Sequence, residues 1–263
     1  RAVVHGAGRV EPVSSAGAQP RSPVRWARWG QASRLLAHRL APKTPAVLIL
    51  SLPRSGSSWV GDTLGRAADA LYLREPINQS CLVPAKRDAL MAVPAGAPPA
   101  DFAAAAERSF GGWPAFPGSI VTFPWQWRLR ERHQRRLVIK EVIPRACAYF
   151  CQRFQPRLIF LVRHPAAVAL SFVDRGWWSP QRSSWEELGA RQGRILREVQ
   201  DSLAGYPDSR VVLYEDLCLD PVTAFENLFA YAGLAWDSPL AGYVAQSTSR
   251  GDTNDPYSTT RHS

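Results

Sequence analysis

A short loop with three serines, one glycine and one arginine is the first feature of this sequence that could do chemistry. It reads Pro-Arg-Ser-Gly-Ser-Ser-Trp over residues 53–59 and directly follows the apolar run at residues 46–52. Gly56 permits a positive φ and close approach of a ligand to the backbone, and Arg54 carries a fixed positive charge. A helix that starts after the loop adds free N–H groups and the positive end of its dipole. The loop therefore predicts an anion site, and the alternative is a serine-rich turn that caps a helix.

A second polar pair follows another apolar run, at residues 157–162. Arg163 comes directly after this run, and Ser171 lies two turns along the helix that we expect next. Together they could hold a phosphate, because the arginine side chain is a fork-shaped hydrogen-bond donor. Taken singly, Arg163 could form a surface salt bridge and Ser171 could be a surface hydroxyl.

These two segments resemble the signature segments of the sulfotransferase family. Residues 53–59 are similar to the loop that binds the 5′-phosphosulfate, and residues 163–171 to the segment that binds the 3′-phosphate. Residues 211–217, followed by Asp220-Pro221, resemble the family's later strand and helix start. The resemblance covers residues 46–233, with a fainter continuation at residues 257–262.

The resemblance implies the donor 3′-phosphoadenosine 5′-phosphosulfate (PAPS), its product 3′-phosphoadenosine 5′-phosphate, and no metal. The residues implied to line the phosphosulfate are Arg54, Ser55, Gly56, Ser57, Ser58 and Trp59. Arg163 and Ser171 would hold the 3′-phosphate, which distinguishes this donor from ATP, and Arg261 resembles a late nucleotide contact of carbohydrate sulfotransferases. The implied reaction moves a sulfuryl group to an acceptor hydroxyl or amine, and a carbohydrate is one candidate acceptor.

Sulfuryl transfer by in-line displacement needs charge stabilisation and a base for the acceptor. Arg54 stands where many family members have a lysine, so its help to the leaving group is electrostatic, because arginine does not readily release a proton. Lys140 resembles a strand lysine that small-molecule enzymes follow two residues later with a catalytic histidine, but that position here is Val142. A phenol- or steroid-type enzyme is therefore disfavoured. Lys140 either contacts the sulfuryl oxygens or is a solvated lysine at a strand end.

Glu75 is the candidate that replaces the missing histidine as general base. It follows the apolar segment at residues 70–74, which we expect to be a second strand beside the first. The glycan-modifying branch of the family has a similar Glu-Pro pair after its phosphosulfate loop. The alternative is a carboxylate paired with Arg74 or Arg54, and Glu141 is the reserve candidate for the base.

Alternating strands and helices must position these groups. We expect strands at residues 46–52, 70–74, 137–141, 157–162 and 210–214. We expect helices at residues 59–69, 101–110, 125–134, 144–154, 165–175, 184–203 and 221–232, with loop over the last thirty residues. This order predicts an α/β fold, a three-layer P-loop-like domain with a central parallel sheet flanked by helices. Ligands of such sheets bind beyond the carboxyl ends of the strands.

Composition and charge add broader expectations. Residues 1–45 form a basic arm, expected to be flexible with a short helix at residues 28–40, and residues 46–263 form one domain whose closing segment we expect to be cut short. The net charge of +10 fits an anionic partner or an arginine-rich genome. The longest apolar run is too short to span a membrane, so we expect a cytoplasmic protein, with the Golgi lumen or an organelle as alternatives.

Two other functions stay open at this point. A P-loop kinase or nucleotide hydrolase would carry a lysine after the loop glycine, where this chain has Ser57. A basic nucleic-acid-binding protein fits the charge, but the sequence has no recognised motif for such binding, so we expect no nucleic-acid partner.

Overall fold

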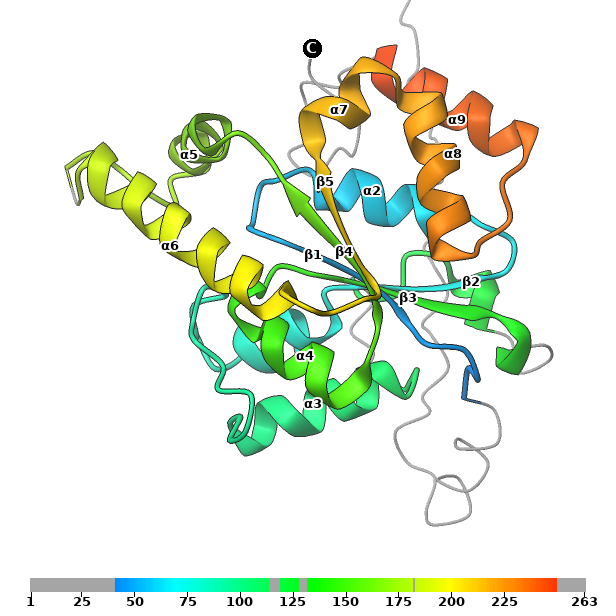
Figure 1. Ribbon diagram of the computed structural model, residues 1–263, viewed down its shortest axis with the longest axis horizontal. Helices are drawn as coiled ribbons and strands as arrows, with labels where there is room; N and C mark the ends of the chain where they lie inside the picture. Colours follow the sequence, from blue (N-terminus) through cyan, green and yellow to red (C-terminus); the bar gives the residue numbers. More distant parts are fainter. Residues whose placement is uncertain (1–40, 114–118, 128–131, 182, 250–263) are drawn as a thin grey trace, which may run out of the picture.

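Five parallel strands form the centre of the part of the chain that the structure describes (Figure 1). The structure is a computed structural model that describes residues 41–113, 119–127, 132–181 and 183–249. In sheet order the strands are β2 (Ala70–Arg74), β3 (Arg136–Glu141), β1 (Val47–Ser51), β4 (Arg157–Val162) and β5 (Ser209–Leu213). All neighbouring pairs run parallel. The predicted parallel sheet is therefore confirmed.

Strand β3 lies between β1 and β2, which differs from the order that we expected. We predicted that the second strand lies beside the first, but β3 pairs with both and separates them. Val138 of β3, for example, is in register with Val47 of β1 and with Tyr72 of β2. β3 is apolar over Leu137, Val138 and Ile139, all fully or almost fully buried, as expected for a strand covered on both faces.

Helices cover both faces of the sheet and give the predicted three layers (Figure 1). One face carries α2 (Ser57–Leu64), α8 (Pro221–Ala232) and α9 (Ser238–Ser249). The other face carries α3 (Ala100–Phe110), α4 (Cys147–Phe154) and α6 (Trp185–Leu203). The two connecting helices are α5 (Pro165–Asp174), after β4, and α7 (Tyr214–Leu219), after β5.

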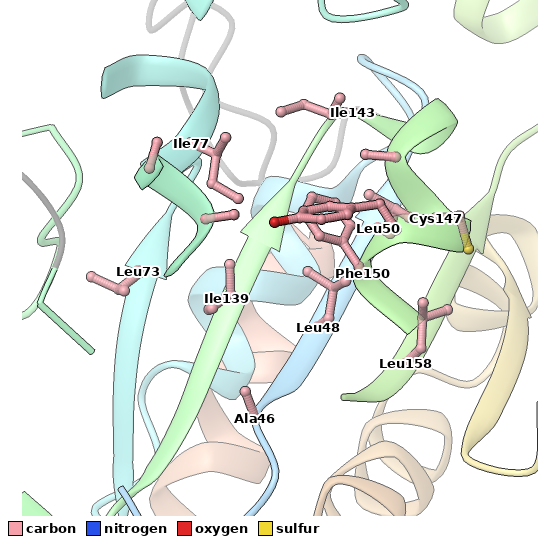
Figure 2. Packing of buried hydrophobic residues seen from close by; sticks show 14 of the residues in the cluster. Ala46, Leu48, Leu50, Leu73, Ile77, Ile139, Ile143, Cys147, Phe150 and Leu158 are labelled. Atoms are coloured by element: carbon pink, nitrogen blue, oxygen red, sulfur yellow. The ribbon is translucent and has the colours of Figure 1, made fainter. Parts of the chain in front are cut away.

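Two apolar cores result, one on each side of the sheet. Figure 2 shows the core between the sheet and α4, in which Leu48 and Leu50 of β1 lie near Phe150. On the opposite face Ile49 packs in a separate cluster with Phe225 of α8. This alternation along β1 follows from the pleat, because successive side chains of a strand point to opposite faces. Burial on both sides fixes the strand and with it the start of the loop at residue 53.

Several predicted elements are wrong or shifted. The α-helix expected at residues 125–134 is not found in the described part of this segment, which holds short 3₁₀ turns at Pro124–Trp127 and Arg132–Gln134. The guanidinium of Arg132 stacks on the ring of Trp127 at 4.7 Å, so tertiary packing decides the backbone here. The loop expected at the end of the chain contains α9, and the short α7 was missed. The expected helix at residues 28–40 lies outside the described residues.

Helix α2 packs against the sheet through two glycines, Gly61 within the helix and Gly65 at its C-cap. A Cβ on Gly61 would lie 3.1 Å from the Cβ of Lys140, and a Cβ on Gly65 would lie 2.6 Å from Cγ of Tyr72. Tyr72 is fully buried and has no room to move. Small residues therefore set the distance between the loop that precedes α2 and the ends of β2 and β3.

None of the helices that the structure describes has the length and apolar character needed to cross a bilayer.

We predict that Gly65→Ala lowers the free energy of unfolding by about 2 kcal/mol, because overpacking a buried contact of this kind costs about 1–3 kcal/mol. The control is Gly189→Ala on α6, where an added Cβ meets nothing within 4 Å. That change should stabilise the protein by about 0.5–1 kcal/mol, the ordinary gain of alanine over glycine in a helix. Chemical denaturation of both variants checks the pair, and equal effects would contradict the proposed close packing.

Candidate active site

The loop after β1 has two residues in the left-handed backbone region. Arg54 has φ 69° and Gly56 has φ 85°, both in the left-handed region. Gly56 is the N-cap of α2 and no side chain caps this helix. The first N–H groups of a helix have no acceptor within the helix, so those of Ser57 and Ser58 are directed to whatever binds at the loop. The dipole of α2 favours an anion there.

Glycine is required at position 56 for a second reason. A Cβ at this position would collide with the ring of Tyr214. Tyr214 is the first residue of α7 and follows the end of β5, so the last strand of the sheet covers the loop that follows the first. The ring of Tyr214 also lies under the guanidinium of Arg163 at 4.7 Å. Tyr214 thus joins the two predicted phosphate-binding segments, a role that the sequence analysis did not assign.

Part of the loop faces the protein interior. Ser51 Oγ donates a hydrogen bond to Ser57 Oγ at 2.8 Å, and both side chains are buried. Trp59 packs against Phe225 with ring centroids 4.8 Å apart, and its Nε1 donates to Ser247 Oγ of α9 at 3.0 Å. The indole of Trp59 is therefore placed in the core beneath the loop. The predicted contact between Trp59 and the donor stays a prediction, and the buried position of the indole does not favour it.

Ser55 is the loop residue with unmet hydrogen-bonding capacity. Its side chain is fully buried, and its hydroxyl has no hydrogen-bond partner among the described residues. An unsatisfied buried hydroxyl costs about 1–3 kcal/mol. A phosphosulfate oxygen in the loop would supply the missing acceptor, so this hydroxyl fits the implied ligand.

The structure brings the two predicted segments into direct contact. Arg54 Nε donates to Ser171 Oγ of α5 at 2.8 Å, and Arg163 Nη1 donates to the backbone oxygen of Arg54 at 3.2 Å. Ser171 is therefore not the isolated surface hydroxyl of the alternative interpretation. Arg163 forms no ion pair with a carboxylate in the described part of the chain, so the surface salt bridge is not found either. Arg54 is the residue through which the two segments meet.

Positive charge gathers around Arg54. Burial lowers the pKa of this guanidinium, and the nearby charges of Arg175 and Arg163 lower it further, against the opposing effect of Asp174 and Glu75. Like charges brought together in a partly buried place favour an anion between them. Arg175 was missed by the sequence analysis, although its position one helical turn after Ser171 was the available signal. Arg261, the other predicted nucleotide contact, lies outside the described residues.

Lys140 and Glu75 form a buried ion pair at the neighbouring strand ends. Lys140 Nζ donates to Glu75 Oε1, and only 2% of the lysine side chain is exposed. The solvated strand-end lysine is therefore excluded, and the direct partner of Glu75 is Lys140 rather than Arg74 or Arg54. Asn78 Nδ2 donates to the other carboxylate oxygen, Oε2, at 2.8 Å, a contact that sequence reasoning did not foresee.

Opposing effects act on the pKa of Glu75. Burial alone would raise it, but the charge and hydrogen bond of Lys140 and the hydrogen bond from Asn78 leave the pKa below its ordinary value. Glu141, the reserve candidate, lies on the same strand as Lys140 but is fully buried, and burial raises its pKa to about 8. Its Oε1 accepts a hydrogen bond from the backbone N–H of Ile77 at 2.6 Å. The two carboxyl groups thus differ sharply in surroundings.

The fold defines an α/β protein of the P-loop-like class, with a cluster of basic and hydroxyl side chains at the carboxyl ends of its strands. A model of the sulfotransferase family matches residues 45–238, most of the chain. The chain therefore belongs to the sulfotransferase family, and it is an enzyme of the sulfuryl-transfer class. No curated protein sequence matches it.

Solved structures of sulfotransferases are also similar to this chain. The sulfotransferase of Alicyclobacillus acidocaldarius is 13% identical with a TM-score of 0.43, over 77% of this chain and 90% of that one. The sulfotransferase domain of the Synechococcus PCC 7002 olefin synthase is 21% identical with a TM-score of 0.47, over 76% and 77%. A mouse sulfotransferase complexed with PAP is 15% identical with a TM-score of 0.42, over 87% and 80%. These likenesses are distant, so the assignment rests on the family match.

We predict that Lys140→Met lowers the free energy of unfolding at pH 7 by about 3 kcal/mol, because it leaves a largely buried carboxylate without its cation. The lowered pKa of Glu75 contributes stability that is present above the ordinary glutamate value of 4.5 and is lost as the pH falls through the folded-state pKa. The difference in the free energy of unfolding between wild type and variant should therefore become smaller in acid. Urea unfolding at pH 7 and at pH 4 measures both differences, and a constant difference would argue against the ion pair.

Proposed function

We propose that this enzyme takes the sulfuryl group from PAPS and moves it to an acceptor hydroxyl or amine by in-line displacement. One observation carries the proposal: the loop after β1 and helix α5 are joined by the hydrogen bond from Arg54 Nε to Ser171 Oγ. Two anion-binding segments in contact suit a ligand with two separate phosphate-type groups. A nucleotide with a 3′-phosphate and a 5′-phosphosulfate has this form.

The loop and α5 would divide the donor between them. The N–H groups at the start of α2, with the hydroxyls of Ser55 and Ser58, suit the 5′-phosphosulfate, since this helix end favours negative charge. Arg163 and Ser171 suit the 3′-phosphate. The Ser171 hydroxyl already accepts a hydrogen bond from Arg54, and a hydroxyl that accepts keeps its own proton to donate. Arg54 lies between both groups and stabilises charge on the leaving phosphate.

Lys140 and Glu75 would act on the sulfuryl group and the acceptor. Lys140 Nζ bonds Glu75, so its charge at present stabilises the carboxylate and weakens it as a base. A sulfuryl oxygen is a competing acceptor for the same ammonium group. Once Lys140 turns to it, burial dominates the surroundings of Glu75 and its pKa rises, which favours removal of the acceptor proton. The pair therefore couples charge stabilisation to base strength.

The acceptor that we favour is a carbohydrate hydroxyl. The catalytic histidine position of small-molecule enzymes is Val142, a buried residue that cannot take a proton. Next to Arg54, the ring of Trp177 is 59% exposed, with the guanidinium 5.8 Å from its centroid. An exposed indole at the edge of a site offers a flat surface on which a sugar face can stack.

The proposal also includes two earlier expectations. Residues 46–263 form one domain, and the protein is located in the cytoplasm.

We predict that the protein binds 3′,5′-adenosine diphosphate at least about tenfold more tightly than AMP, because Arg163 forms charge-assisted hydrogen bonds to the 3′-phosphate. Arg163→Gln should remove this preference and leave AMP binding unchanged. Arg194→Gln, the same loss of charge on the exposed side of α6, is the control. Calorimetry with 3′,5′-adenosine diphosphate, AMP and ATP decides it. Equal affinity of the wild type for all three would refute the assignment of Arg163 and Ser171.

We predict that Glu75→Gln keeps donor binding but lowers kcat by at least about 100-fold, the usual contribution of a general base. Labelled PAPS with a panel of glycans and small alcohols measures turnover, and calorimetry measures donor affinity. Glu226→Gln on the exposed face of α8 is a matched control that should change neither. Full turnover in Glu75→Gln would show that another group takes the acceptor proton.

A further inference from the structure

The turn that carries Glu75 is held by two consecutive residues of β3. The backbone N–H of Glu75 donates to the carbonyl oxygen of Lys140 at 2.7 Å. Two residues later, the backbone N–H of Ile77 donates to Glu141 Oε1 at 2.6 Å. The main chain of Lys140 and the side chain of Glu141 thus fix both ends of the short segment that presents the Glu75 carboxylate.

This segment needs external support because its backbone is strained. Glu75 has φ 50°, a left-handed conformation that residues other than glycine seldom adopt. A π-helix, Asn78–Leu82, follows directly, and such turns occur often at functional sites. Strained backbone persists only where surrounding contacts determine it. The hydrogen bond to Glu141 is one of those contacts, and it comes from a neighbouring strand rather than from the turn itself.

Glu141 is placed where it cannot meet an acceptor. Its side chain is fully buried, one oxygen is occupied by the Ile77 N–H, and the other has no partner in the described part of the chain. Glu75, by comparison, is 20% exposed in its side chain and stands at the edge of the site. A general base must come within hydrogen-bond reach of the proton it removes. Burial therefore favours Glu75 over Glu141, the reserve candidate, in the role of base.

We propose that Glu141 is a positioning residue, which holds the strained turn through the Ile77 amide and so aims the Glu75 carboxylate at the acceptor. This inference rests on the proposed role of Glu75 as the base. The buried Glu141 carboxyl would then have a function that does not require contact with the substrate. This role also gives a reason why a glutamate, rather than an apolar residue, stands in this part of the core.

The charge of Glu141 suits this role. Burial raises its pKa to about 8 against the lowering effect of the Ile77 hydrogen bond, and the charges of Glu75 and Lys140 act on it in opposite directions. A pKa in this range keeps the carboxyl mostly protonated at neutral pH, so that it accepts the Ile77 hydrogen bond through its carbonyl oxygen and leaves Lys140 to Glu75. The charged groups that face it are Glu75 and Lys140. When Glu141 ionises above this pH, its negative charge competes with the sulfuryl oxygens for the Lys140 ammonium group, so kcat should fall.

Two substitutions separate positioning from proton transfer. Glu141→Gln keeps an oxygen that accepts from Ile77 and cannot ionise, so turnover at pH 7 should be retained and the fall in kcat near pH 8 should disappear. Glu141→Leu removes the acceptor at similar volume, and kcat should fall about 10- to 100-fold, because small misplacements of catalytic groups cost this much. The affinity for 3′,5′-adenosine diphosphate should stay unchanged in both. The KM for the acceptor should change less than kcat.

The opposite results would overturn the proposal. Loss of turnover in Glu141→Gln equal to that of Glu75→Gln would make Glu141 the base, and an unchanged kcat in Glu141→Leu would remove its positioning role. Should Glu141→Leu fail to fold, the pH profile of Glu141→Gln decides the question, and a fall in kcat near pH 8 that persists there counts against the proposal.

A second measurement does not depend on activity. The Ile77 amide should exchange its hydrogen slowly in the wild type and in Glu141→Gln, and much faster in Glu141→Leu, as followed by NMR. Equal exchange in wild type and Glu141→Leu would show that the hydrogen bond does not hold the turn. If the wild type transferred no sulfuryl group from PAPS to any acceptor, the proposed function would fail, while the exchange result would still test whether Glu141 holds this turn.

Discussion

The parallel arrangement of β2, β3, β1 and β4 is the constraint on which the site depends. Because all these strands run in one direction, their carboxyl ends meet at one edge of the sheet, and each loop that leaves this edge contributes to the same place. β1 delivers Arg54, β2 delivers Glu75, β3 delivers Lys140 and β4 delivers Arg163. The position of β3 between β1 and β2 is decisive, because it sets Lys140 between the loop and the candidate base.

The site carries several features that oppose stability. Arg54 and Glu75 have positive φ without being glycine, the Ser55 hydroxyl is buried without a partner among the described residues, and guanidinium groups crowd around Arg54. Strain of this kind costs about 1–3 kcal/mol at each residue. The two apolar cores offset this free-energy cost, since strands buried on both faces fix the positions at which the loops begin and end. Such a distribution, with a rigid sheet under a strained edge, is expected where a ligand completes the hydrogen bonding.

The sequence was sufficient for the five strands along the chain and for the polar residues near their carboxyl ends. Continuous apolar runs identified β1 and β4, and the arginines of the loops after them, Arg54 and Arg163, lie in contact in the structure. The order of the strands within the sheet was not predictable. The apolar pattern does not show that β3, which comes third along the chain, lies between β1 and β2 in the sheet. The partner of Glu75 was missed for this reason. Helix α9 was missed because its sequence, with Gly242 and many small polar residues, lacks a strong helical pattern.

If Glu75 is the base, as we propose, its ion pair with Lys140 must be weakened before the acceptor reacts. A carboxylate whose pKa is lowered by a buried ammonium group is a weak base, yet a general base works best when its pKa lies near the operating pH. The pair resolves this conflict only if a further negative group draws the lysine away. Burial, the largest single effect on Glu75, then acts unopposed and raises the pKa. Under the proposed mechanism, the same buried position would make Glu75 a stronger base once the charge of Lys140 is shared with the sulfuryl oxygens.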